Sequence, residues 1–432
     1  MKTNVLAALL LSAAVSPCAY ADDTGRLTDL EKKIEILSGE IERIKLGSTD
    51  TEPAELSSQL GFGPAASKIY QKSEKRVSFG GYGESLYEDF EKRKEDGTGS
   101  GKTDKADFLR AVLYVGYKFN NWITLNSEFE FEHASTGGSG EVGAEMVQLD
   151  FAPWGKVFGF RTGLLLMPVG LVNEVHEPTT FHGAKRPSIE TNIYPTTWRE
   201  NGAGVFGEIG MFSYRSYLVA GLQASNAAGT SGFSASSGLR GGRTKGSNSP
   251  AGDFAWVGRL DAAPIEGTLI GASFYTGQAD HQVQTLASVP VTLWDVHAKA
   301  EYKGAEIRGL YTEGRIGNVD SLNIRRGIAL GSASSIGSKM FGGYFEAAYD
   351  VFHEFDMKGH YLAPFFLYER YDTQMDVPDG WTESGANSRR EYTFGLTYKP
   401  IAQVVVKFDH QVLRNQASTG VGQNNFAVGY IF

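Results

Sequence analysis

The last ten residues, QNNFAVGYIF (423–432), alternate along the chain and end on an aromatic residue. Successive side chains of a β-strand point to opposite sides. One side of this stretch carries Phe426, Val428, Tyr430 and Phe432, and the other carries Asn425, Ala427 and Gly429. The ends of soluble domains usually fray into a few polar residues. The pattern therefore predicts a final strand that is hydrogen-bonded as far as Phe432.

The same two-residue period recurs through the chain from Val77 onward, in stretches of about 10 to 13 residues. Examples are DFLRAVLYVGYKF (107–119), WITLNSEFEFEH (122–133), VTLWDVHAKAEY (291–302) and QVVVKFDHQ (403–411). In the first of these, Leu109 and Leu113 belong to the apolar face, and Arg110 belongs to the polar face. Soluble strands average about 5–6 residues, whereas a tilted membrane-spanning strand needs about 9–11. The lengths favour strands that face lipid over the alternative, a soluble β-sandwich.

The connections between these stretches alternate in length. Counting along the chain gives about 16 strands, joined by seven short turns and eight longer loops. Transmembrane barrels have this asymmetry between their two ends. An unpaired strand edge in hydrocarbon would leave a row of backbone polar groups without partners, so the last strand must pair with the first, VSFGGYGESLYED (77–89). The sequence thus predicts an all-β fold, a transmembrane antiparallel β-barrel over 77–432, with a short N-terminal α-helical coiled coil.

The first 21 residues, MKTNVLAALLLSAAVSPCAYA (1–21), are typical of a secretory signal peptide. Lys2 precedes an apolar run over 5–15, and an Ala-x-Ala sequence ends at Ala21. A lipid anchor at Cys18, the only cysteine of the chain, is the alternative, which Pro17 disfavours. A chain cleaved after Ala21 would contain neither a disulfide bond nor a thiolate metal site.

Residues 22–46 predict a coiled coil that lies in the periplasm. Their apolar side chains step by three and four residues, as in a heptad seam, at Leu27, Leu30, Ile34, Leu37, Ile41 and Ile44. The mixture of Leu and Ile does not distinguish two strands from three, and a single amphipathic helix lying on another surface is the alternative. Residues 47–76 have no sustained periodicity and contain several Gly, Pro and Ser residues, which predicts a linker.

A barrel of about 16 strands is wide enough to enclose an aqueous channel. The alternation places charges of both signs on the predicted lumen wall, at Arg110, Lys118, Glu128, Glu130, Glu132, Arg161, Arg259, Lys299 and Lys407. We expect most of them to be solvated wall residues and a minority to lie near the narrowest passage. The chain has 41 basic and 50 acidic residues. It therefore lacks the excess of basic residues that is typical of a nucleic-acid-binding protein.

The third long loop, over 170–199, is the predicted constriction of this channel. Its prolines stiffen it, and Phe181, Tyr194 and Trp198 can anchor it by packing. Opposed charges across a pore select solutes by charge and hydration, and the loop offers Glu174, His176, Glu177, His182, Lys185, Arg186, Glu190 and Arg199. The alternative is an external loop with ordinary surface charge.

The sequence predicts no catalytic residue, no cofactor and no metal site. His176 and His182 are six residues apart in a loop, which is a weak metal-site pattern. The acidic stretch DTQMDVPDGWTE (372–383) lacks the ligand spacing of a calcium loop. The Gly-rich stretch 225–246 lacks the strand–loop–helix setting of a phosphate-binding loop. We therefore do not expect an enzyme.

Several stretches resemble one family of bacterial proteins. They are GPAASKIY (63–70), SFGGYGE (78–84), ETNIYPTTWRENGAGVFGE (190–208) and the terminal Phe432. With these, the chain resembles the trimeric Gram-negative outer-membrane porins of the phosphate-selective porin O/P type, and is similar to the coiled-coil-bearing dicarboxylate porins. The resemblance implies a homotrimer with one pore per protomer, a coil that bundles three chains in the periplasm, and a role for Phe432 as the signal read by the assembly machinery.

Together these features predict a porin of the bacterial outer membrane. Its water-filled channel would let small hydrophilic solutes or ions diffuse passively, with selectivity set by loop 170–199 and by the lumen charges. Its expected partners are these solutes, outer-membrane lipid and two further copies of the chain. The alternatives are a phosphate- or anion-selective porin, a structural tether of the outer membrane, and a barrel that acts as a sleeve for a partner protein.

Overall fold

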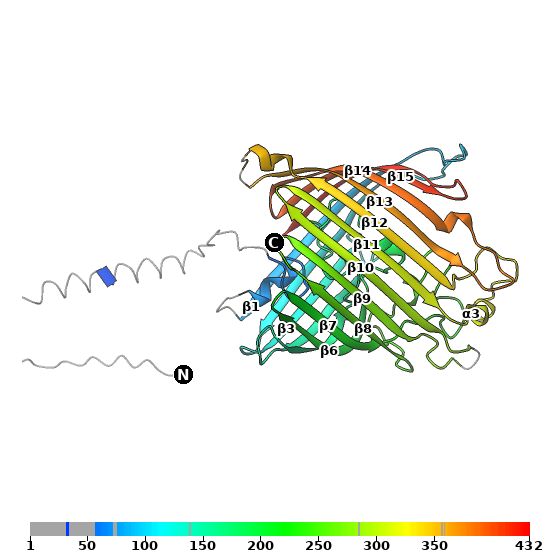
Figure 1. Cartoon of the computed structure of the whole chain (residues 1–432), viewed down its shortest axis with the longest axis horizontal. Coiled ribbons are helices and arrows are strands. Elements are labelled where there is room, and N and C mark those ends of the chain that lie inside the picture. Colours follow the sequence, from blue (N-terminus) through cyan, green and yellow to red (C-terminus); the bar gives the residue numbers. More distant parts are fainter. Residues whose placement is uncertain are drawn as a thin grey trace, which may run out of the picture. The chain divides into compact units, whose positions relative to one another are not determined.

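The computed structural model describes residues 32–33, 57–71, 76–137, 140–283, 286–355, 357 and 359–432. The predicted signal peptide and all six apolar residues of the predicted coil lie outside this part of the chain. Contacts divide the chain into two units, Met1–Glu55 and Leu56–Phe432. The second unit contains a closed antiparallel barrel in which each strand pairs with its neighbours in sequence and the last pairs with the first (Figure 1).

Sixteen strands make up the barrel in the described part of the chain. They are β1 (Val77–Phe90), β2 (Lys105–Lys118), β3 (Ile123–Glu132), β4 (Val142–Phe151), β5 (Gly159–Leu166), β6 (Arg199–Ile209), β7 (Phe212–Ala220), β8 (Phe254–Ala262), β9 (Thr268–Gln278), β10 (Pro290–Tyr302), β11 (Ala305–Ile316), β12 (Lys339–Tyr349), β13 (Tyr361–Asp376), β14 (Ser388–Ile401), β15 (Val404–Asn415) and β16 (Gln423–Ile431). The helical segments are short: η1 (Ala66–Tyr70), α2 (Ile189–Asn192), η2 (Arg240–Gly242), α3 (Val319–Arg325), η3 (Val351–Phe355) and η4 (Gly385–Asn387).

The predicted β-barrel and the predicted strand count are confirmed, and the predicted coil stays a prediction. The connections alternate between shorter turns, such as 210–211, and longer loops, such as 167–198 and 221–253. We refer to the two ends of the barrel as the turn side and the loop side. In the described part of the chain, no helix has both the length and the apolar character needed to cross a membrane.

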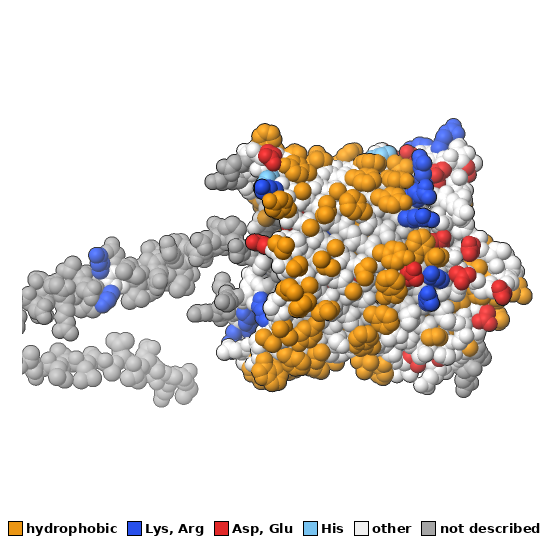
Figure 2. Space-filling model, viewed as in Figure 1, with side chains coloured by type: hydrophobic (Ala, Val, Ile, Leu, Met, Phe, Trp, Pro, Cys, Tyr) orange, Lys and Arg blue, Asp and Glu red, His pale blue; other side chains and the backbone are white. Residues whose placement is uncertain are grey.

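The outer surface of the barrel is apolar. Leu113, Phe129 and Phe408 point outward and are 46%, 39% and 51% exposed, whereas Glu128 and Lys407, which point inward, are buried. Figure 2 shows one face of this surface, on which hydrophobic side chains cover the strands and charged ones gather mostly toward the strand ends. Apolar-out and polar-in alternation is the pattern of a barrel in lipid, so the predicted orientation of the two faces is confirmed for these strands.

A β-bulge interrupts the alternation on β2. Glu84 pairs with Arg110 but Leu86 pairs with Asp107, so Ser85 opposes both Phe108 and Leu109. The extra residue shifts the facing of the strand. The prediction that Leu109 faces outward is therefore wrong, since Leu109 packs inside, with Leu86, while Phe108 is exposed.

The two ends of the barrel domain close the sheet. β1 pairs with β16 from Tyr82 and Ile431 to Phe90 and Gln423. Beyond the last strand residue, Phe432 accepts a hydrogen bond from the Gly81 N–H (3.0 Å) and donates one to the Gly81 carbonyl (2.9 Å). The prediction of a strand paired up to its last residue is confirmed. The role of Phe432 in assembly stays a prediction.

Residues 57–71 differ from the linker that we expected over 47–76. This segment lies against inward-facing residues of the barrel wall: Asn126 donates to the Ala66 carbonyl (3.1 Å), and the Tyr70 hydroxyl donates to Asp150 (2.8 Å). Phe62, Ala65 and Ala66 are buried in a small apolar cluster with wall residues. Apart from the short helical segment η1, the segment forms no regular element, and it fills an irregular space beside the wall. We call it the N-terminal insert.

Candidate functional site: the channel interior

Loop 167–198, between β5 and β6, folds into the barrel, and we call it the inward loop. Its predicted anchors Phe181, Tyr194 and Trp198 are buried. The Tyr194 hydroxyl lies within hydrogen-bond distance of Asp295 on β10 (3.2 Å) and of the Thr312 hydroxyl on β11 (2.5 Å). The loop thus reaches walls far from the two strands that it joins, as the constriction hypothesis requires.

Inward carboxylates accept hydrogen bonds from the loop backbone at widely separated points. The Gly170 N–H donates to Asp295 (3.2 Å), the Ala184 N–H to Asp409 on β15 (2.6 Å), and the Ile189 N–H to Glu369 on β13 (3.0 Å). Buried backbone groups need partners. These wall carboxylates therefore position the loop.

Inward cations satisfy the carbonyl groups of the same loop. Arg308 donates to the Thr180 carbonyl (3.1 Å), Lys399 to the Thr179 carbonyl (2.9 Å) and Lys407 to the Gly183 carbonyl (2.9 Å). The Lys407 ammonium also lies 3.6 Å from the centroid of the Phe181 ring. Many of the inward charges thus hold the loop across the barrel.

The acidic residues of the loop make different kinds of contact. Glu174 lies 3.1 Å from the Arg215 guanidinium and 3.8 Å from that of Arg259. Glu177 accepts hydrogen bonds from the backbone N–H groups of Ala65 (3.0 Å) and Ala66 (2.9 Å), and so attaches the N-terminal insert to the loop.

Glu190 closes the loop on itself. Its carboxylate accepts from the N–H groups of Leu171 (3.1 Å) and Val172 (2.7 Å) and from the Tyr344 hydroxyl (2.8 Å). Burial raises the pKa of Glu190, and these three donors act in the opposite direction. These contacts hold the shape of the loop around Glu190.

The basic residues of the predicted constriction lie toward the loop side. Lys185 pairs with Glu88 (2.9 Å), and Arg199 pairs with Glu145 (2.7 Å). Arg186 donates to the carbonyl group of His176 (3.1 Å).

The predicted wall residues divide between structural pairs and cavity linings. Arg110 bridges Glu84 (3.2 Å) and Glu130 (2.9 Å). Arg161 pairs with Asp150 (2.8 Å). These guanidinium groups are neutralised within the wall.

Four further predicted wall residues lie near the ends of the barrel. On the turn side, Arg259 pairs with Asp261 (2.8 Å), Lys299 pairs with Glu301, and Lys118 donates to the Gln71 carbonyl (3.0 Å). On the loop side, Glu132 lines a cavity. The functional roles of all these residues stay predictions.

Two cavities lie on opposite sides of the loop. The loop-side cavity has a volume of about 380 Å³, and Glu132, Lys185 and Arg240 are among its lining residues. The turn-side cavity has a volume of about 460 Å³, and Lys299 is among its lining residues. Phe181 lines both, so the loop separates the two cavities at this ring.

Sequence reasoning missed two arginines of the loop-side cavity, which come from loop 221–253. Arg240 donates to the carbonyl groups of Thr191 (3.1 Å) and Thr196 (2.9 Å), and Arg243 donates to that of Pro195 (3.0 Å). Burial, together with the charge of Arg240, lowers the pKa of Arg243 to about 10. The sequence feature that could have indicated them is LRGGRTK (239–245), which places two arginines in a glycine-rich loop.

Arg186, Arg240 and Arg243 form what we call the arginine cluster. All three line the loop-side cavity. In the described part of the chain, none of them lies within ion-pair distance of a carboxylate. The cluster therefore places three cations without a directly paired carboxylate in a cavity whose other lining charges have both signs.

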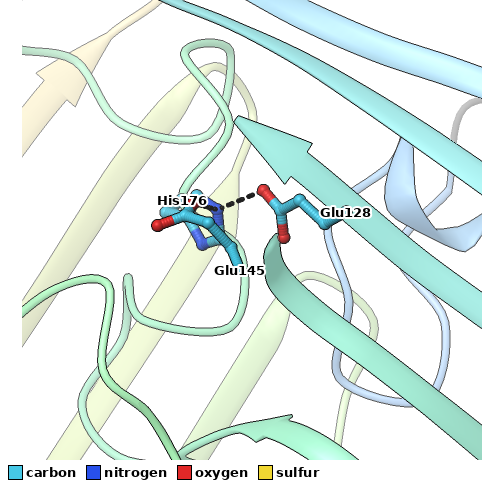
Figure 3. Close-up of side chains that lie close together, drawn as sticks. All are labelled: Glu128, Glu145 and His176. Atoms are coloured by element: carbon cyan, nitrogen blue, oxygen red, sulfur yellow. Dashed lines mark hydrogen bonds and ion pairs between the residues drawn. The ribbon is translucent and has the colours of Figure 1, made fainter. Parts of the chain in front are cut away.

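Three buried side chains meet near the N-terminal part of the loop (Figure 3). His176 Nε2 lies 3.0 Å from a Glu128 oxygen on β3 and 3.6 Å from a Glu145 oxygen on β4. Each of the three side chains has one possible metal-ligand atom, and these three atoms lie within 4.8 Å of one another. Glu128 and His176 are among the predicted site residues, whereas Glu145 is not, because residues 128, 145 and 176 form no recognisable spacing.

Comparison with solved structures identifies the fold as that of outer-membrane porins. The anion-selective porin of Comamonas acidovorans matches with a TM-score of 0.52 and 11% identity, over 82% of this chain and 99% of that one. OmpF of Salmonella typhi matches with a TM-score of 0.51 and 12% identity, over 82% and 97%. The loop L8 deletion mutant of OmpT of Vibrio cholerae matches with a TM-score of 0.51 and 10% identity, over 82% and 99%.

No protein-family model matches the chain. An uncharacterized protein of Aquifex aeolicus is 35% identical over 357 residues, which cover 81% of this chain and 78% of that protein. Identity at this level over most of both chains indicates common descent and a common fold. The chain therefore belongs to the same family as this Aquifex aeolicus protein.

Proposed function

We propose that the chain is a porin of a bacterial outer membrane, whose channel lets small hydrophilic solutes or ions diffuse passively. One observation carries this proposal: a closed barrel with an apolar outer surface holds two charge-lined cavities, one on each side of the inward loop. An apolar exterior suits lipid, and a charged interior suits water and hydrated solutes.

Phe181 is the proposed narrow point, because its ring lines both cavities. The decisive experiment is single-channel conductance of the purified protein in planar bilayers. Replacing the ring by Phe181→Ala should raise the conductance. The matched control is Phe408→Ala, which shortens an outward side chain on β15 and should leave the conductance unchanged. A wild-type protein that inserts into bilayers but conducts no current contradicts the proposal.

The arginine cluster favours a second candidate, an anion-selective porin. Cations that are not neutralised nearby raise the local concentration of anions. The double variant Arg240→Gln and Arg243→Gln should then shift the reversal potential in a salt gradient toward cation selectivity. Arg93→Gln, in the exposed loop 91–104, should cause no shift. Equal reversal potentials in all three proteins would rule out the cluster as a selectivity element. Selectivity for phosphate among anions is the narrowest form of this candidate.

We further propose a homotrimer, with the residues 27–44 of three chains forming a coil in the periplasm. The heptad seam supports this arrangement. A coil of this length is marginal alone, so the barrels must contribute to assembly. Deletion of 22–46 should lower the stability of the trimer in detergent and leave the single-channel conductance unchanged. If the deletion instead detached the envelope with no change in solute uptake, the tether alternative would be favoured.

A further inference from the structure

Two of the buried histidines place one carboxylate at each ring nitrogen. His297 has Asp295 at Nδ1 (2.5 Å) and Asp261 at Nε2 (2.9 Å). His182 has Glu346 at Nδ1 (2.7 Å), and its Nε2 lies 2.9 Å from the Tyr361 hydroxyl and 3.4 Å from Glu306. An imidazolium has one N–H on each nitrogen and can donate in both directions. Protonation of both nitrogens therefore gives a donor to each carboxylate around these two rings, although the Arg259 guanidinium also lies 3.1 Å from His297 Nε2.

His176 is arranged differently. Its Nδ1 lies 2.8 Å from the Asn173 carbonyl oxygen, which only accepts hydrogen bonds, so Nδ1 carries a proton. Its Nε2 faces two carboxylates at once, those of Glu128 (3.0 Å) and Glu145 (3.6 Å) (Figure 3). In the neutral ring, Nε2 would present a lone pair to negatively charged oxygens. With both carboxylates ionised, a positive charge at this point, either a proton on Nε2 or a bound cation, offsets their charge.

A proton on Nε2 leaves the remaining oxygens without partners. The second oxygen of Glu128, and the oxygen of Glu145 that faces His176, are both buried and lack a hydrogen-bond partner. The three side chains are at most 2% exposed. Each unsatisfied buried polar group costs about 1–3 kcal/mol, and more when it is charged. One cation coordinated by all three side chains gives the Glu145 oxygen a partner and neutralises the Glu128 carboxylate.

The geometry suits a small cation with mixed nitrogen and oxygen ligands. Tetrahedral sites with bonds of about 2.0–2.1 Å have ligand–ligand separations of about 3.4 Å, and the two measured separations from Nε2 are 3.0 and 3.6 Å. Metal-bound histidines usually donate their other N–H to a carbonyl or carboxylate, as His176 does to Asn173. The other Glu145 oxygen is held by Arg199 (2.7 Å).

We propose that Glu128, Glu145 and His176 bind one divalent transition-metal ion, for which Zn²⁺ is the probe. Imidazole with carboxylates is a ligand set for Zn²⁺ and similar ions, whereas Ca²⁺ and Mg²⁺ prefer oxygen ligands alone. The ion joins the inward loop to β3 and β4 and so stiffens its N-terminal part. The proposal goes beyond channel function, because it concerns how the loop is held and does not depend on which solute passes.

The test measures zinc in the full-length folded protein. The protein is stripped with a chelator, dialysed against Zn²⁺ with excess Mg²⁺, and analysed by mass spectrometry for bound metal. We expect one zinc ion per chain, and X-ray absorption should show nitrogen and oxygen ligands. His176→Gln and the isosteric Glu145→Gln should each weaken zinc affinity by at least about 100-fold, since loss of outer contacts alone costs about 10–100-fold.

The matched control is His182→Gln, which removes the other buried histidine of the same loop and should leave one zinc ion per chain. Heat-dependent migration on denaturing gels shows whether each variant is folded. Folded wild-type protein that retains no zinc overturns the proposal and leaves His176 as an imidazolium. Equal zinc loss in His182→Gln and His176→Gln overturns it too, because binding would then not depend on the three residues.

Discussion

Leu109 and Leu113 lie four residues apart on β2, yet their surroundings are opposite. Leu113 is 46% exposed on the outer surface, whereas Leu109 packs inside with Leu86 and with Ala184 of the inward loop. On the wall, a two-residue period and its bulges decide the facing of each side chain. Inside, long-range contacts decide it. The direction in which a side chain points therefore has different causes on the wall and in the loop.

The wall and the loop also differ in what holds them together. Backbone ladders join each strand to two neighbours. The loop backbone is held mainly by charged wall side chains, such as those of Asp409 and Lys407. A wall defect therefore affects the whole barrel, whereas the loss of one loop contact has a local effect.

The largest expected effect concerns the pairing of β1 with β16, which closes the barrel. At Gly81 a Cβ would lie 2.3 Å from the Val112 carbonyl and 2.7 Å from the Phe432 ring. Gly81→Val should abolish most of the folded protein, because the backbone of these paired strands cannot move away without losing its ladder. The measurement is the fraction of protein with heat-dependent gel migration after refolding. Gly99→Val is the control, since its Cβ would meet no atom within 4 Å. If both variants folded with the yield of the wild type, the close packing at Gly81 between β1 and β16 would be contradicted.

The next effect compares the two leucines directly. Leu113→Lys places a charge on the lipid side and should lower the free energy of unfolding by about 2–4 kcal/mol. Leu109→Lys places the same charge beside the loop-side cavity, which Leu109 lines, and should cost less than half as much. Urea titrations of both variants in lipid vesicles give the two values. A reversed order would contradict the facing that the bulge imposes.

A smaller effect is expected where the loop meets β15. Asp409→Ala leaves the Ala184 N–H without its acceptor, a loss of about 1–3 kcal/mol that is confined to the loop. Hydrogen exchange of Ala184 should accelerate, and current noise in single channels should increase while the barrel stays folded. The control is Asp376→Ala, at the exposed end of β13. Unfolding of the whole barrel by Asp409→Ala would show that the loop and the wall are one cooperative unit.

The smallest effect concerns the exposed loop 91–104, which serves as a contrast to the inward loop. Hydrogen bonds from Lys92 and from the Phe90 N–H lower the pKa of Asp104. A lowered pKa means that the contact contributes fully above the ordinary pKa of an aspartate, and that this contribution is lost as the pH falls from there through the lowered pKa. Proteolysis of the loop should therefore increase at low pH in the wild type and less so in Asp104→Asn. Single-channel conductance should not differ between the two proteins.

Periodicity was sufficient to predict the wall. The two-residue alternation and the loop lengths gave the strand count, the closure and the outward face. Periodicity could not locate the bulge at Phe108 and Leu109, because a bulge depends on the pairing with the partner strand and does not change the local sequence pattern. The prolines and aromatic residues of 170–199 were enough to place that loop inside.

The remaining features depend on contacts between distant segments. Glu145 meets His176 only after the loop folds inward, and Arg243 reaches Pro195 from a separate loop. The N-terminal insert has no periodicity of its own, and its position depends on partners such as Asn126 and Glu177. No local pattern reports such partners, so these parts could not be predicted.

The bond between Ala184 and Asp409 joins residues 225 positions apart. Lys407 and Gly183 are 224 positions apart. When the chain is made from its N-terminus, the loop is synthesised long before β15, and contacts between such distant residues form slowly. The contacts between this loop and β15 therefore form among the last steps of folding, and a chain truncated before β15 lacks both the acceptor for the Ala184 N–H and the donor to the Gly183 carbonyl.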